Sequence, residues 1–202
     1  MASASRRRRR LLRGAGVSFR VAASGVAESG ILAKSPASLT RRLALAKARC
    51  VAGRFAGSII LAADTIVVLG RRVLGKPSDA EGAVSMIRAL RGRTHRVITG
   101  VAVLAPGQRP RLTHVETKVR MRRYSDLEIA RYVKSGSPFD KAGAYAIQNS
   151  KFAPVENYKG CYCNVMGLPL WTTLRLLERA GMKKFFARKL PGVCADCPLK
   201  AK

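Results

Sequence analysis

The chain has 202 residues, of which 48% are hydrophobic, so it is long enough for one α/β domain with a sizeable core and too apolar to be disordered throughout. Lysine and arginine number 39 against 11 acidic residues, and the resulting net charge of +28 attracts polyanions such as nucleotides, nucleic acid or an anionic surface without distinguishing among them. No apolar run approaches the ~20 residues that a membrane-spanning helix needs, so we expect no membrane partner.

The chain opens with MASASRRRRRLLRG, and two interpretations compete for its run of arginines. The first 27 residues contain no acid and are rich in Arg, Ser and Ala, a composition typical of organellar transit peptides. On a helix capped by Ser5, however, Arg7 and Arg8 project toward the apolar side, where a phosphate at the helix start would give them a partner. The remaining arginines of this helix share the solvated face: Arg6, Arg9, Arg10 and Arg13.

Residues 36–55 predict a helix, because Pro36 suits a first turn and apolar residues recur on one stripe. Residues 58–64, SIILAAD, form a short apolar run typical of a buried strand in a mixed or parallel sheet, and they end in Asp64. Residues 65–77 continue as strand, turn and short strand, punctuated by glycines.

The pattern of strands intermixed with helices continues along the chain and indicates the α/β class. We expect one domain over residues 1–182 and a basic, mobile tail over residues 183–202. The elements expected after residue 77 are a helix over 78–92 capped by Ser78, strands over 93–106 and 111–122, a helix over 125–136 and a last helix over 167–182.

Five cysteines, without an apolar secretory segment, suit a reducing compartment and free thiols, so we expect a cytoplasmic protein. Cys161 and Cys163, then Cys194 and Cys197, form two close pairs along the chain. A four-thiolate zinc site is conceivable, but C-x-C is a poor spacing for structural zinc and a long gap separates the pairs. We therefore interpret the cysteines as incidental.

Several short motifs follow one another in a specific order: MASASRRRRRLL, GVAES, SPASLTRRLALAKA, ADT, GKP, GRTHRVITGVAV, SDLEIARYVKSGSPFDKAGAYAIQ and NVMGLPL. In this order and spacing the chain resembles the Maf family of nucleoside triphosphate pyrophosphatases, which makes the N-terminus part of the domain. The resemblance implies a mixed, twisted sheet flanked by helices, with two lobes around a deep cleft. It also implies hydrolysis of a nucleoside triphosphate to the monophosphate and pyrophosphate, assisted by Mg²⁺ or Mn²⁺. The motif ADT, followed by DKAGAY and a glutamine, is similar to the pattern in the branch of the family that acts on dTTP and UTP.

The resemblance further implies roles for individual residues. Asp64 matches the proposed proton acceptor of the family, and Arg7, Thr65 and Gln148 match positions linked to substrate choice. The other matched polar positions of the cleft are Arg8, Glu28, Lys47, Lys76 and Lys141.

The chemistry of these side chains supports the same roles. Attack of water on the α-phosphorus builds charge on phosphoryl oxygens and on the departing pyrophosphate, which positioned cations and a divalent metal stabilise. Asp64 at the end of an apolar strand can bind metal or orient water, although a turn or cap residue gives the same pattern. Gln148 offers an amide donor and acceptor to a pyrimidine edge, whereas Lys47 by itself reads as a surface lysine. His95 and His114 are interpreted as structural.

Three features depart from the family pattern. Arg6 stands where the family has proline, only Met1-Ala2-Ser3 remain of the first strand, and the charge exceeds what the chemistry requires. The leading hypothesis is a pyrimidine-preferring pyrophosphatase with a house-cleaning role, a homodimer by analogy with the family. The alternatives are a basic nucleic-acid-binding or division-control protein on the same fold, with nonspecific nucleic-acid binding from its charge, and an inactive homologue.

Overall fold

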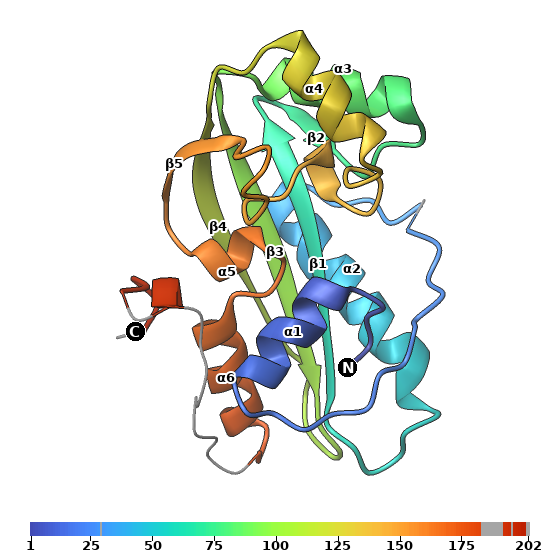
Figure 1. Cartoon of the computed structure of the whole chain (residues 1–202). Coiled ribbons are helices and arrows are strands. Elements are labelled where there is room, and N and C mark those ends of the chain that lie inside the picture. The colour runs from blue at the N-terminus through green and yellow to red at the C-terminus, as the bar shows by residue number, and fades with distance from the viewer. Residues whose placement is uncertain (29, 183–191, 195, 201–202) are drawn as a thin grey trace.

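The computed structural model describes residues 1–28, 30–182, 192–194 and 196–200. It confirms the α/β class, with the sheet in the middle of the molecule and helices on both of its faces (Figure 1). The predicted mobility of the tail falls on residues 183–202, most of which lie outside the described residues. The strands are β1 (Ile60–Leu69), β2 (Arg72–Leu74), β3 (Thr94–Leu104), β4 (Arg111–Met121) and β5 (Val155–Lys159). The helices are α1 (Arg6–Gly14), α2 (Pro36–Ala52), α3 (Ala80–Leu90), α4 (Asp126–Lys134), α5 (Tyr162–Val165) and α6 (Leu170–Arg179), with short 3₁₀ turns η1 (Ala142–Ala144) and η2 (Gly192–Cys194).

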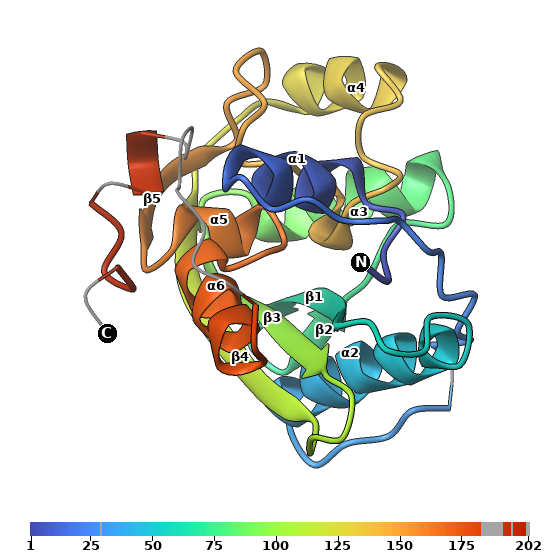
Figure 2. The same cartoon turned by 90° about the horizontal axis from the view of Figure 1, so that it is seen from below.

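The sheet has the strand order β2-β1-β3-β4-β5, and it is twisted (Figure 2). Every pairing between described strands is antiparallel, whereas the apolar run SIILAAD suggests a mixed or parallel sheet. The run is apolar for another reason, because helices cover both faces of β1 and all but one of its residues are buried. The pairing of β1 with β3 places Asp64 opposite Gly100.

Helix α2 covers one face of the sheet, and small residues let it approach closely. Ser35 caps the helix by accepting a hydrogen bond from the backbone of Ser38, with proline in the first turn as predicted. At Gly100 of β3 an added Cβ would lie 2.3 Å from the backbone carbonyl carbon of Thr40, so only glycine fits at this crossing.

Helices α1 and α6 cover the opposite face. Ser5 caps α1, as predicted, by accepting the backbone N–H of Arg8 at 3.4 Å. Leu11 and Leu12 are buried and pack against β1, β3 and the leucines of α6. The arginines predicted to lie in solvent are exposed except for Arg9, which is half-buried.

The first three residues lie against β1 and form part of the core. The backbone N–H of Ala2 donates to the carbonyl of Leu61 at 2.7 Å, and the carbonyl of Met1 accepts from Ala22 at 3.0 Å. The first residues of the chain are therefore held from both sides.

Helices α3 and α4 pack together at the end of the sheet away from α1 and α6 and form a second core with β2 (Figure 1). Asp79, and not the predicted Ser78, is the N-cap of α3, because its Oδ1 accepts the backbone N–H of Gly82 at 2.7 Å. Ser125 and Glu128 form a capping box that begins α4, within the helix predicted over residues 125–136.

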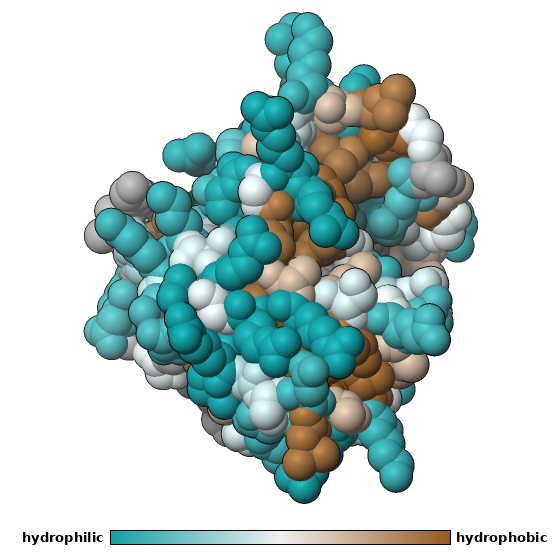
Figure 3. Space-filling model, turned by 90° about the horizontal axis from the view of Figure 1, so that it is seen from above, coloured by the Kyte–Doolittle hydropathy of each residue, from teal (hydrophilic) through white to brown (hydrophobic). Residues whose placement is uncertain are grey.

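Hydrophilic side chains cover most of the face seen from above, with smaller apolar areas between them (Figure 3). Within the described residues, no helix combines the length and the apolar character needed to cross a membrane.

Candidate active site

A cavity of about 800 Å³ lies beside the middle of β1, between the N-terminal residues and Lys47 of α2 on one side and the loops at Lys76 and η1 on the other. Its walls come from the N-terminal residues, the segment before α2, the middle of β1, the loop after β2, the turn around η1 and the segment after α5. Seven of the nine predicted site residues line this cavity: Arg7, Arg8, Glu28, Lys47, Asp64, Thr65 and Lys76.

The cavity contains more cationic than anionic side chains. Among the described residues that line it, the acids are Glu28, Asp64 and Asp140. The cations are Arg6, Arg7, Arg8, Lys47 and Lys76. Such an excess of fixed positive charge in a concave site favours a bound polyanion.

Strand β1 presents both of its faces to the cavity along one open edge. Ala2 pairs with β1 at Leu61 and β2 pairs with it from Val67, so no described strand covers the edge between these points. Asp64 and Thr65 lie in this interval, and as neighbours in a strand they point to opposite faces. Asp64 therefore lies in the middle of a strand, not at its end as the apolar run suggests, but it does lie at the lateral edge of the sheet.

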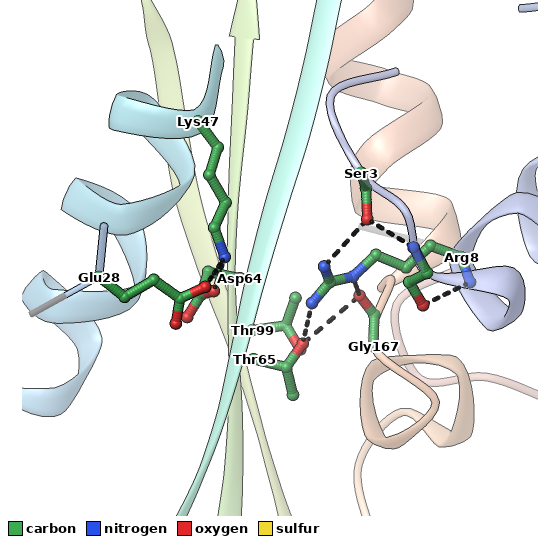
Figure 4. A network of polar contacts seen from close by, with 9 residues as sticks. Ser3, Arg8, Glu28, Lys47, Asp64, Thr65, Thr99 and Gly167 are labelled. Carbon is green, nitrogen blue, oxygen red and sulfur yellow. Dashed lines mark hydrogen bonds and ion pairs between the residues drawn. The ribbon is translucent and has the colours of Figure 1, made fainter. Parts of the chain in front are cut away.

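Asp64 faces α2, where Lys47 joins it to Glu28 (Figure 4). The ammonium of Lys47 lies 2.5 Å from Oδ1 of Asp64 and 2.7 Å from Oε1 of Glu28. The side chains of Lys47 and Asp64 are only 12% and 7% exposed, while that of Glu28 is 55% exposed. The second carboxylate oxygen of Asp64 has no hydrogen-bond partner among the described residues and remains available to another ligand.

The carboxylate of Glu28 is kept ionised by the cations around it. Burial by itself raises the pKa of Glu28, but the hydrogen bond and charge of Lys47, with the charges of Lys76 and Arg8 beyond it, outweigh burial and lower that pKa below its ordinary value. Two carboxylates and an ammonium thus form one charged cluster on this side of β1.

Arg8 occupies the other side of β1 and binds only neutral oxygens (Figure 4). Its Nε donates to the carbonyl of Gly167 at 2.7 Å, and its two terminal nitrogens donate to the hydroxyls of Thr65 at 2.9 Å and Ser3 at 3.3 Å. Burial lowers the pKa of Arg8, and the charge of Asp64 counteracts this effect. Since no described carboxylate lies within 4 Å, the positive charge of Arg8 is not neutralised by an ion pair.

Arg7 lies beside Arg8 and is less firmly held. One terminal nitrogen of Arg7 donates to the backbone carbonyl of Asp140 at 3.4 Å, and its buried Nε has no hydrogen-bond partner in the described structure. Burial lowers the pKa of Arg7, which the charge of Asp140 partly offsets. A buried and unsatisfied guanidinium N–H is costly, so this side of the cavity suits an incoming acceptor.

Lys76 follows Gly75 in the loop after β2, and its exposed side chain lines the cavity entrance. The carbonyl of Gly75 accepts the backbone N–H of Gly143 at 2.9 Å, so this loop is tied to the turn around η1. The loop that contains G-K-P therefore presents a lysine to the cavity.

Two predicted site residues do not line the cavity. The ammonium of Lys141 contacts the carbonyl of Ser137 and the carboxylate of Asp140, both in its own loop. The ion pair with Asp140 uses the charge that the predicted contact with phosphate would need. Gln148 is exposed on the segment that follows η1. Both positions depend on how this loop folds locally, and the roles predicted for them stay predictions.

Tyr145 is a residue of the site to which the sequence analysis assigned no role. The ring of Tyr145, from DKAGAY, lines the cavity, and its hydroxyl lies 2.7 Å from Nε2 of His95. Burial lowers the pKa of His95 to about 4, so this imidazole is neutral near pH 7 and its position matches the structural interpretation. His114 instead contacts Arg41 on the sheet surface, with 2.8 Å between their nitrogens.

Comparison with known proteins relates the chain to a single family. The model of the Maf-like protein family matches residues 1–180. A dTTP/UTP pyrophosphatase of Thermomicrobium roseum is 50% identical, with 98% of this chain and 92% of that protein covered. Proteins of the same name from Symbiobacterium thermophilum and Myxococcus xanthus are 48% and 46% identical, covering 92% and 90% of this chain and 95% and 92% of their own lengths. The chain therefore belongs to the Maf-like protein family.

Proposed function

We propose that this protein hydrolyses dTTP and UTP to the nucleoside monophosphate and pyrophosphate. The names of its relatives support this reaction, and so does the chemistry of the cavity. The observation that carries the proposal is the convergence of Asp64 and Thr65 on the open edge of β1, with a lysine–carboxylate cluster on one side and two half-buried arginines on the other.

The reaction needs a proton acceptor for water and cations around the phosphates. Asp64 has one carboxylate oxygen fixed by Lys47 and the other without a described partner, which suits it to accept the proton of an attacking water. Lys76 and Arg7 present positive charge toward the same cavity, where they would stabilise charge developing on the phosphoryl oxygens. Arg8 positions Thr65 and the segment at Gly167 around the substrate.

The side chains also fit a divalent cation, which is a proposal from the family resemblance. Glu28 and Asp64 both contact the ammonium of Lys47 and supply hard carboxylate oxygens, the ligand type that Mg²⁺ and Mn²⁺ prefer. Among the described residues no group of three or more His, Cys, Asp or Glu side chains is arranged to hold a metal ion, so substrate phosphates would complete the ligand set. When bound, the cation would withdraw charge from the phosphoryl oxygens.

Of the three residues predicted to select the base, two line the cavity and one does not. Thr65 and Arg7 line the cavity, where a hydroxyl and an unsatisfied guanidinium N–H can meet the oxygens of a pyrimidine. Gln148 is exposed and would need the loop after η1 to move before it contacts a base. A house-cleaning role, a homodimeric assembly and a cytoplasmic location are further proposals, and they rest on the family resemblance and the free thiols.

The test is pyrophosphate release from a panel of nucleoside triphosphates in the presence of Mg²⁺ or Mn²⁺. We expect activity on dTTP and UTP, and we expect Asp64→Asn to lower kcat by about 100-fold or more, because the amide cannot accept the proton. Asp126→Asn is the matched control, since that exposed carboxylate pairs with Arg88 and Arg91 far from the cavity. Full activity of Asp64→Asn, or no pyrophosphate from any nucleotide, contradicts the proposal.

A further inference from the structure

The two cysteine pairs of the sequence meet in one place beside the sheet. We name Cys161, Cys163, Cys194 and Cys197 the cysteine cluster; all four side chains are buried in the core that α6 and β3 share. The first pair belongs to the segment of α5, and the second pair comes from the C-terminal part of the chain. The fold therefore brings together thiols that are 31 residues apart in sequence.

Within the cluster, Cys163 and Cys194 make the closest contact. Their sulfur atoms lie 2.7 Å apart, compared with about 2.05 Å in a covalent disulfide, so joining them needs a displacement of less than about 1 Å. The hydrogen bond between the two thiols raises the pKa of Cys163 and lowers that of Cys194, which makes Cys194 the more acidic partner. Burial raises the pKa of Cys161 to about 12, and this thiol stays protonated.

The backbone of Cys194 is held in position by a side chain of α6. The indole nitrogen of Trp171 donates to the carbonyl of Cys194 at 3.0 Å, and Arg175, one turn later, donates to the carbonyl of Leu199 at 2.9 Å. These contacts hold the segment of the second pair beside α6, independently of any bond between sulfurs.

The cluster is connected to the cavity through α5. Cys163 precedes Asn164, whose carbonyl accepts a hydrogen bond from Thr99 at 3.1 Å, and Thr99 in turn contacts Thr65 at 2.9 Å. Gly167, which holds Arg8, lies four residues after Cys163. The position of Cys163 therefore affects the segment that supports the arginine side of the cavity.

We propose that Cys163 and Cys194 are a redox-active dithiol that forms a reversible disulfide and clamps α5 to the C-terminal segment. With a hydroperoxide as oxidant, the thiolate of Cys194 attacks the peroxide oxygen and becomes a sulfenic acid, with hydroxide as the leaving group. The thiol of Cys163 then attacks that sulfur, and water leaves as the disulfide forms. Two thiols and one hydrogen peroxide thus give one disulfide and two waters, and a dithiol reductant reverses the change.

A disulfide in a protein that otherwise keeps free thiols is typically transient or redox-sensing, so this dithiol would respond to oxidant and not be permanently oxidised. Oxidation would restrict the unfolded chain and stabilise the segment around Gly167. This inference concerns thiol chemistry, so its outcome is separable from the hydrolysis proposed for the cavity.

The experiment uses the full chain with Cys50→Ser, which removes the exposed fifth thiol. The protein is treated with hydrogen peroxide, denatured and alkylated, and its mass and tryptic peptides are measured. We expect two fewer alkylated thiols, a peptide that links Cys163 to Cys194, and complete reversal by dithiothreitol. We also expect the oxidised form to melt on the order of 5 °C higher and to show slower amide exchange over residues 161–167.

Matched variants test the pairing. Cys194→Ala removes the loss of thiols and the shift in Tm, whereas Cys197→Ala, at a buried position of the same segment, retains both. Full alkylation after oxidation, or a linkage of Cys163 to a different cysteine, overturns the proposal. One tightly bound zinc per chain in the purified protein, with thiols that react only after chelation, overturns it as well because the cluster would then be a metal site.

Discussion

At the scale of single residues, the half-buried Arg8 both supports the structure and contributes charge to the cavity. The guanidinium of Arg8 makes three hydrogen bonds to three separate parts of the chain, at Gly167, Thr65 and Ser3. All three acceptors are neutral, so these bonds connect parts of the cavity wall without neutralising the charge of the arginine. That positive charge can therefore attract an anion in the cavity.

This geometry makes lysine a poor substitute for Arg8. A single ammonium cannot reach three diverging acceptors, so we expect Arg8→Lys to lower the free energy of unfolding by about 1–3 kcal/mol. Chemical denaturation followed by circular dichroism measures this effect. Arg10→Lys is the control, because Arg10 is exposed on the same helix and the same substitution there should leave stability unchanged. Equal stability of the two variants would show that the three contacts contribute little.

At the scale of elements, the close crossing of α2 over β3 positions the lysine that bridges two carboxylates. Lys47 extends from α2 toward Asp64 on β1, and the distance between helix and sheet is set at Gly100, where no side chain fits. A helix held farther from the sheet would separate the ammonium from Asp64.

We therefore expect Gly100→Ala to be strongly destabilising, by about 3 kcal/mol or more, because its methyl group would overlap the backbone at Thr40. Thermal and denaturant unfolding measure the loss, and any folded fraction should have reduced activity. Gly53→Ala is the matched control, since an added Cβ there meets no atom within 4 Å and its φ of −60° suits alanine. Similar unfolding curves for the two variants would contradict this view of the crossing.

The capping box of α4 makes stability depend on pH. The backbone hydrogen bond at Ser125 and the ion pair with Arg122 lower the pKa of Glu128 to about 2, from an ordinary value of 4.5. Because the folded-state pKa is the lower one, the contribution is complete above about pH 4.5 and is lost as the pH falls toward 2.

Denaturant unfolding at a series of pH values tests this contribution. Glu128→Gln retains a cap acceptor but cannot titrate, so its free energy of unfolding should fall less steeply with acid than that of the unaltered protein over this interval. Parallel curves for the two proteins would mean that the pKa of Glu128 is the same in the folded and the unfolded protein.

At the scale of the whole molecule, the charge of +28 exceeds what the cavity uses. Three of the five cations that line the cavity are half-buried, whereas most of the other described lysines and arginines lie on the surface and form no ion pair with the acidic residues. Nothing in the fold arranges these cations and aromatic rings into a platform for bases, so a sequence-specific nucleic-acid function has no support among the described residues.

The surface charge nevertheless predicts binding to duplex DNA that depends on salt and not on sequence. Fluorescence anisotropy with two unrelated duplexes should give equal affinities at about 50 mM salt and a loss of 100-fold or more by about 200 mM. A complex that distinguishes the two duplexes and survives at the higher salt would instead support a dedicated nucleic-acid function.

Much of this structure could be predicted from local patterns. Periodicity and capping residues predict most of the helices and strands but not β5 or α5, and the order of short motifs indicates the family. The helical wheel also separated Arg7 and Arg8 from the outward arginines, since the direction of a side chain on a helix follows from its position in the chain alone.

What the tertiary structure decided depends on contacts between residues distant in sequence. The open edge of β1 exists because Ala2 and β2 pair with its two ends and nothing described pairs between them, and no local pattern encodes such an interval. Likewise, the separation of Lys141 and Gln148 from the cavity, and the meeting of Cys163 with Cys194, follow from how loops close in space. Local sequence determines which way a backbone turns and which face is apolar, but only packing determines which distant side chains become neighbours.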